Sequence, residues 1–145
     1  MLQTVNVIVI RAFMFSDTKM MVDALSREEG RLSCVCTVGK SARGRSRRQI
    51  FRPLSMLELT LERKAAGRLA TVKDAHIATP FTSIPFDPYK LTISMFLAEF
   101  LGNATKSEQS SPYLYDYIRD SILWLDGAGT GFSNFHLVFM MRLSK

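Results

Sequence analysis

The sequence is poor in residues that build disulfide scaffolds and in long apolar runs. It has only two cysteines, Cys34 and Cys36, in 145 residues. A bridge between alternate residues of one strand would be strained, so we expect two free thiols in a reducing compartment. The apolar stretch 5–15 is interrupted by Asn6 and Arg11 and is shorter than the roughly 20 residues of a spanning helix. With no recognisable secretory signal, these features favour a cytoplasmic protein without a membrane partner.

Catalytic motifs are also missing. The two histidines, His76 and His136, each stand alone, and the sequence contains no nucleophile elbow, P-loop or zinc-protease motif. The glycine-rich segment 127–131 follows a predicted helix, whereas a phosphate-binding loop follows a strand. Cys34 and Cys36 have the wrong spacing for a structural zinc site. We therefore expect a protein that is not an enzyme and that holds no metal or cofactor.

Positive charge is present, and it is concentrated in one short segment. The chain has 19 Lys and Arg against 13 Asp and Glu, a formal net charge of +6. Residues 40–52 contain no acidic residue and themselves carry +6. The basic residues of this segment are Lys40, Arg43, Arg45, Arg47, Arg48 and Arg52. Their guanidinium groups can form forked hydrogen bonds to phosphate oxygens, so the segment predicts a polyanionic partner.

Alternating apolar residues predict five strands in the first half of the chain. The first, near residues 5–10, is apolar on nearly both faces. The others are expected over the ranges 20–26, 31–38, 54–62 and 69–77. Five such strands suit a small barrel, for which the OB-fold is the commonest solution and an SH3-like barrel is an alternative. The alternation slips in phase at Met56 and Leu57, which predicts a bulge.

The second half changes to helical spacing. Asp87-Pro88 and Ser111-Pro112 predict two helix starts, and a third helix is expected near residues 135–143. Because that helix reaches the end without a capping glycine, we expect a truncated helical domain. The predicted fold class is α+β, with an OB-fold nucleic-acid-binding domain over 1–80 and an incomplete helical domain over 81–145.

Several aromatic and basic residues are further candidates for binding. Tyr113, Tyr115, Tyr117 and Trp124 are expected to pack between helices, with a groove for a partner peptide as the alternative. Phe51, after the basic segment, is a candidate for stacking on a base. The alternative is a solvated loop with a buried Phe51. The weaker basic candidates, near strand ends, are Lys19, Arg31, Arg68 and Lys73.

The order and spacing of several short segments match a known family. The segments are 16–18, 25–33, the arginine-bearing loop that Gly39 opens, 51–59, and the fifth strand running into 77–81. Over residues 4–82 they resemble RecO, a family of bacterial recombination-repair mediators, and the resemblance continues more weakly through the helices. The basic surface of the family's OB-fold carries over only in the Gly39–Arg52 loop.

This resemblance implies an OB-fold followed by a helical domain. It also implies binding of single- and double-stranded DNA, annealing of complementary strands and help in loading RecA recombinase. The implied partners are RecR and the acidic C-terminal tail of single-stranded-DNA-binding protein, in the bacterial cytoplasm and at the nucleoid. The four-cysteine zinc site of some members has no counterpart in this sequence. The residues alone leave two alternatives open, an RNA-binding OB-fold protein and a module that recognises acidic peptides.

Overall fold

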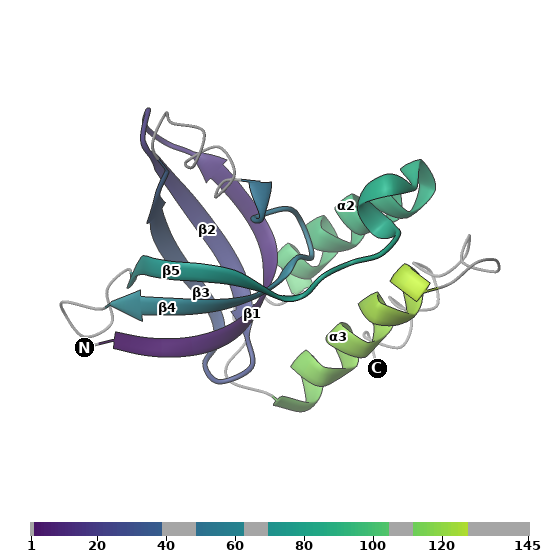
Figure 1. The fold of residues 1–145 in the computed structure, drawn as a ribbon. Coiled ribbons are helices and arrows are strands. Elements are labelled where there is room, and N and C mark those ends of the chain that lie inside the picture. The colour runs from purple at the N-terminus through teal and green to yellow at the C-terminus, as the bar shows by residue number, and fades with distance from the viewer. Residues whose placement is uncertain (1, 39–48, 63–69, 105–111, 128–145) are drawn as a thin grey trace.

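A five-stranded barrel is followed by helices packed on its outside (Figure 1). The computed structural model describes residues 2–38, 49–62, 70–104 and 112–127. The strands are β1 (Leu2–Met14), β2 (Lys19–Ser26), β3 (Gly30–Thr37), β4 (Met56–Glu62) and β5 (Ala70–Thr79). The helices are the short 3-10 helix η1 (Ile84–Phe86), α2 (Pro88–Ala104) and α3 (Pro112–Gly127). The predicted third helix lies outside the described residues.

The strands close into a barrel in the order β1-β2-β3-β5-β4, with β4 pairing back onto β1. Four of the five pairings are antiparallel, and β3 and β5 run parallel, with Cys34 opposite Ala70. This closed five-stranded barrel with a parallel β3–β5 pair is an OB-fold, as predicted. Closure leaves the paired strands of the barrel without a free edge.

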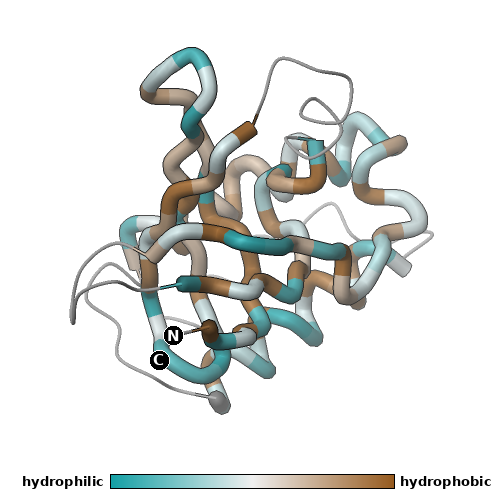
Figure 2. Tube along the Cα trace, turned by 60° about the vertical axis from the view of Figure 1, so that its left-hand side comes forward, coloured by the Kyte–Doolittle hydropathy of each residue, from teal (hydrophilic) through white to brown (hydrophobic). Residues whose placement is uncertain are grey.

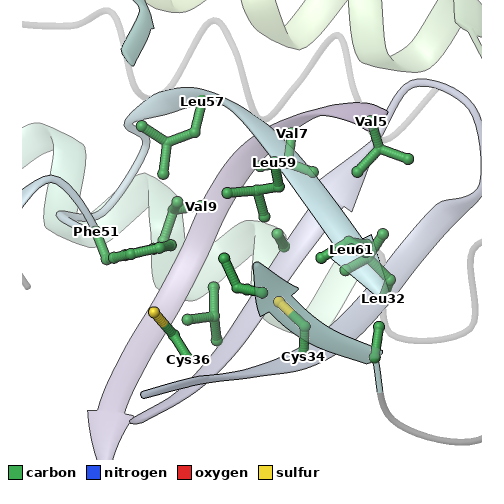
Figure 3. Packing of buried hydrophobic residues seen from close by; sticks show 14 of the residues in the cluster. Val5, Val7, Val9, Leu32, Cys34, Cys36, Phe51, Leu57, Leu59 and Leu61 are labelled. Atoms are coloured by element: carbon green, nitrogen blue, oxygen red, sulfur yellow. The ribbon is translucent and has the colours of Figure 1, made fainter. Parts of the chain in front are cut away.

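Strand β1 is apolar on both faces because it belongs to two hydrophobic cores. Val5, Val7 and Val9 point into the barrel, where they meet buried side chains of the other strands (Figure 3). Ile8 and Ile10 lie in a second core, built between the barrel and the helices. Burying an aliphatic side chain of this size contributes roughly 1.5–3 kcal/mol, so both faces of β1 stabilise the fold. Hydropathy accordingly changes from residue to residue along the strands (Figure 2).

The predicted bulge in β4 is confirmed. The β4–β5 register shifts between Met56 and Leu57. Met56 belongs to the core under the helices, whereas Leu57 points into the barrel. The phase slip in the sequence therefore marks the point where this strand begins to contribute to the barrel interior. Cys34 and Cys36 are buried in that interior as free thiols, as expected.

Both predicted helix starts are confirmed. At α2 the Asp87 carboxylate accepts hydrogen bonds from the backbone N–H of Tyr89 at 2.9 Å and of Lys90 at 3.3 Å. This satisfies two of the otherwise unpaired donors at the helix N-terminus. Helix α3 begins at Pro112 and buries a stripe of side chains against the second core. The buried residues of this stripe are Tyr115, Ile118, Ile122 and Leu125.

The aromatic residues of α3 divide between core and surface. Tyr115 is buried in the second core, where packing had been expected. Burial and the nearby Glu28 charge raise the pKa of Tyr115 to about 12. Tyr117 is partly buried, whereas Tyr113 and Trp124 are exposed. The four residues therefore do not form one packed group.

Polar contacts hold both helices against the barrel. Arg27, in the β2–β3 turn, donates from Nε to Asp116 Oδ1 of α3 at 3.1 Å. Arg31 of β3 donates from Nη1 to the Gly102 carbonyl oxygen of α2 at 2.8 Å. A Cβ at Gly102 would lie 3.1 Å from the Ile10 Cγ2 atom, so glycine permits this close approach of α2 to β1.

A buried polar cluster joins α3 to the segment that leaves the barrel. The Asp126 carboxylate accepts hydrogen bonds from the backbone N–H of Thr82 and Ser83, both at 2.8 Å, and of Ile84 at 2.9 Å. Lys90, 3 % exposed, donates to Ser83 Oγ at 2.7 Å. Burial raises the pKa of Asp126, but the backbone donors more than offset this and hold it below its ordinary value. The cluster therefore stabilises the ionised carboxylate.

Candidate nucleic-acid interface

The described helices leave one part of the barrel surface uncovered. It consists of the outward side chains of the C-terminal half of β1, together with the paired halves of β2 and β3. Pairing aligns Phe13 with Met21 and Met21 with Val35, and the next row aligns Arg11 with Asp23 and Asp23 with Ser33. We call these residues, with Phe15 and Lys19, the strand face. OB-folds bind oligonucleotides on the β2–β3 face and its flanking loops, so its position is suited to a nucleic-acid strand.

Two exposed aromatic rings give the strand face its binding chemistry. Phe13 is 43 % exposed and Phe15 is 51 % exposed. The Arg11 guanidinium carbon lies 4.9 Å from the centroid of the Phe13 ring. An exposed ring beside a cation can stack on a base while the cation contacts the backbone. The two rings and Arg11 thus form a candidate platform for an unpaired strand.

Asp23 orients the cation of this platform. Its Oδ2 accepts a hydrogen bond from Arg11 Nε at 2.7 Å, and its Oδ1 accepts one from Ser33 Oγ at 2.6 Å. Arg31 Nη2 is 3.9 Å from Asp23 Oδ2. Burial raises the pKa of Asp23, but the Ser33 and Arg11 hydrogen bonds and both arginine charges outweigh it and lower the pKa. The carboxylate therefore stays ionised at neutral pH and holds Arg11 beside the ring.

The basic segment leaves the barrel beside the strand face. Lys19, an exposed residue at the start of β2, pairs with Thr37 at the end of β3. The backbone N–H of Val38 donates to the Thr18 carbonyl at 2.7 Å, immediately before the segment starts. Arg52, at its other end, is exposed. The remaining basic candidates, Lys40, Arg43, Arg45, Arg47, Arg48 and Arg68, lie outside the described residues.

Phe51 is not the stacking residue we expected. It is 4 % exposed and lies in the barrel core. Figure 3 shows its ring beside Val9, in the part of the core that also contains Cys36. Here burial of the ring contributes to the core, and a buried ring presents no face to a base. The burial of Phe51 agrees with the alternative, whereas most of the loop before it lies outside the described residues.

Two weaker basic candidates are engaged in contacts with acidic or backbone groups. Arg31 is engaged with Gly102 and Asp23, and its side chain is 16 % exposed. Lys73 of β5 lies 3.0 Å from the carboxylate of Glu62, the last residue of β4. The outer side of β4 and β5 also carries Glu58 and Asp74 around His76. Thr71, two residues before Lys73, pairs with Val35 of the strand face, so Lys73 lies near the edge of that face and stays a candidate.

Sequence reasoning missed Phe13 and Phe15, although a signal was available. Ala12 and Met14 pack against the barrel core. Side chains alternate along a strand, so the residues between and beyond them must point outward. Two outward phenylalanines near the end of a strand are unusual for a solvated surface and would have been a signal for a candidate binding surface.

Two other kinds of site were searched for in the described part of the chain. Among these residues, no group of three or more His, Cys, Asp or Glu side chains is arranged to hold a metal ion. None of the described helices is both long enough and apolar enough to cross a membrane.

Comparison with known proteins identifies the family. The model for the recombination protein O N-terminal region matches residues 1–81, and that for its C-terminal region matches residues 85–145. Two relatives named DNA repair protein RecO align with this chain over 145 residues. The relative from Phocaeicola vulgatus is 41 % identical to the chain, and the relative from Bacteroides fragilis is 40 % identical. Each alignment covers all of this chain and 60 % of the relative, so the chain spans about 60 % of their length. The chain belongs to the RecO family.

Proposed function

We propose that this chain acts in DNA repair by binding single-stranded DNA along the strand face. The observation that carries the proposal is the exposed Phe13 ring with Arg11 beside it, on the side of an OB-fold where oligonucleotides bind. The names of the relatives support DNA as the nucleic acid. Bases would stack on Phe13 and Phe15, while the arginines of the basic segment would neutralise phosphates.

Annealing follows from the same arrangement. The basic segment follows Val38, whose backbone N–H donates to the Thr18 carbonyl beside the β1–β2 turn, so we propose that its arginines contact the phosphates of a strand on the aromatic rings. Those arginines would lower the repulsion between this strand and a second one, and double-stranded DNA would bind through its phosphates alone. We therefore propose annealing of complementary strands, without catalysis, as the chain's own activity.

The further activities and partners are proposals that rest on family membership. They are help in loading RecA recombinase, and binding of RecR and of the acidic tail of single-stranded-DNA-binding protein. We also propose that the chain works in the bacterial cytoplasm at the nucleoid. RNA binding and recognition of an acidic peptide are the competing functions, because the basic segment carries no feature that selects DNA.

Replacing both exposed rings of the strand face tests the proposal. We expect Phe13→Ala/Phe15→Ala to weaken binding of a fluorescent single-stranded oligonucleotide about tenfold or more in an anisotropy titration, since base stacking contributes roughly 1–3 kcal/mol per ring. Phe86→Ala is the matched control, because Phe86 is 80 % exposed and lies in η1, away from the strand face. Equal affinities of the double variant and the control would contradict the proposal.

The same titration separates the alternatives. An RNA oligomer of the same sequence that binds more tightly than the DNA would favour the RNA-binding function. An acidic peptide that displaces the DNA from the wild-type chain would show that the basic segment serves both partners.

A further inference from the structure

A cavity of about 500 Å³ lies between β1 and the C-terminal half of α2. Its apolar lining includes Ile10, Pro53 and Met95, and its polar groups include Arg11, Glu99 and Asn103. The volume falls within the roughly 300–1,000 Å³ of small-molecule sites, and the mixture of apolar walls with a few polar groups is also typical of them. We call it the β1–α2 groove.

The groove is held in shape by contacts at its base. Gly102 lets α2 approach Ile10 closely, and Arg31 donates to the Gly102 carbonyl oxygen from the barrel side. The neighbouring Ala98 is small and almost completely buried. Because backbone and buried side chains set the separation of β1 and α2, the groove is formed before any ligand arrives, which lowers the entropic cost of binding.

The charges around the groove balance. Arg11 and Arg31 are both within 4 Å of Asp23, and Glu99 adds a second negative charge at the rim. Two positive and two negative groups give no net attraction for an isolated anion. They do provide donors and acceptors around apolar walls, which matches a flat, neutral ring with polar edges.

The groove continues the strand face. Arg11 both lies beside the Phe13 ring and lines the groove. Residues two apart on a strand are separated by roughly 7 Å, so Phe15, Phe13 and Arg11 form a row that leads from the β1–β2 turn toward the groove. An extended strand that stacks on the first two rings would bring its next base to the groove.

We propose that the β1–α2 groove receives one unpaired base of the bound DNA strand. The base would lie against Met95 and Pro53, with its polar edge toward Glu99 and Asn103. Since a base in a duplex is stacked and paired, the groove would take part only in binding of single strands. The inference rests on the proposed function, and it adds to that function a means of distinguishing single from double strands.

Two variants with the same added charge test this role. Met95 and Thr92 are both exposed residues of α2, but only Met95 lines the groove. We expect Met95→Glu to weaken binding of a single-stranded oligonucleotide about fivefold to tenfold, as for loss of one stacked base, and Thr92→Glu to weaken it less than about twofold. Binding of a duplex should be the same for both variants.

Each outcome of this comparison is decisive. Equal loss of single-strand binding in Met95→Glu and Thr92→Glu would contradict the proposal that the groove receives a base. The proposed function would still stand if Phe13→Ala/Phe15→Ala weakens binding of the same oligonucleotide. A parallel loss of duplex binding in Met95→Glu would also overturn it, because a general charge effect would then suffice. If Met95→Glu does not fold, Asn103→Ala at the exposed rim replaces it, with a selective loss of single-strand affinity expected.

Discussion

The middle of β1 and its C-terminal end present very different outer surfaces. Ile8 and Ile10 are covered by the helices, whereas Phe13 and Phe15 remain exposed a few residues later. Both pairs are large and apolar, so hydrophobicity alone does not distinguish them. The register shift between Val9 and Arg11 lies between the two surfaces. The same strand thus stabilises the fold in its middle and carries exposed aromatic side chains at and just beyond its C-terminal end.

The role of an apolar side chain on this strand depends on whether a described helix covers it. In the covered part, polar contacts from β3 and the β2–β3 turn help the apolar ones to hold the helices against the barrel. They are the hydrogen bonds from Arg31 to Gly102 and from Arg27 to Asp116. At the open end, Arg11 and Asp23 support an exposed ring. Substitutions in the covered middle of β1 should therefore change the free energy of unfolding. Substitutions at the open C-terminal end, around Phe13 and Phe15, should change the affinity for DNA.

The largest expected change in free energy is in the covered middle of β1. Ile8 is fully buried between the barrel and the helices, so we expect Ile8→Ala to lower the free energy of unfolding by about 3 kcal/mol through lost burial and the cavity left behind. Urea unfolding followed by circular dichroism measures this. DNA affinity of the folded variant should not change. An Ile8→Ala variant with wild-type stability and weakened DNA binding would contradict the division of β1 into a stabilising middle and a DNA-binding end.

The Asp126 cluster should have the next largest effect. Asp126→Asn replaces a carboxylate that accepts three backbone hydrogen bonds with a group that has one acceptor oxygen, so we expect a loss of about 2 kcal/mol in the free energy of unfolding at pH 7. Urea titrations at pH 7 compare the two chains. Asp120→Asn, an exposed change on the same helix, is the control and should have little effect.

The pH dependence gives the same cluster a second test. The pKa of Asp126 is lower when folded than its ordinary value of 3.8, so the unfolded chain binds more protons between the two values. The stabilisation is therefore fully present above the ordinary pKa and is lost as pH falls through the folded pKa. Asp126→Asn should lose less stability than the wild type over that acidic range. Parallel acid unfolding curves would contradict this role.

The smallest expected free-energy change concerns the basic segment, residues 40–52. We expect Arg43→Ala/Arg45→Ala/Arg47→Ala/Arg48→Ala to weaken single-stranded DNA binding about tenfold and to reduce the salt slope by about 3, since each lost phosphate contact removes about 0.7 from the slope. Anisotropy titrations at several salt concentrations measure both. Arg119→Ala, on helix α3, is the control and should leave the slope unchanged. An unchanged affinity of the quadruple variant at low salt would remove the basic segment from the interface.

Sequence patterns were sufficient for the strands, the bulge and the two helix starts. Alternation, Pro88 and Pro112, and the slip at Met56–Leu57 are local signals, and each one corresponds to a feature of the fold. The stacking residue was different. Phe51 and Phe13 are both phenylalanines near basic residues, but the sequence pointed only to Phe51 as a stacking candidate, and Phe51 is buried. Burial depends on which distant residues surround a side chain, and local spacing does not report them.

The sequence by itself determined the order of the elements, the free buried thiols and the concentration of positive charge before β4. Periodicity and charge are properties of neighbouring residues, so they can be recognised before the chain folds. Only the tertiary structure decided which outer part of β1 the helices cover, that Phe51 belongs to the core, and that Arg11 links the Phe13 ring to the β1–α2 groove. Those outcomes depend on barrel closure and on the contacts that hold α2 and α3 against it, which bring together residues far apart in the chain.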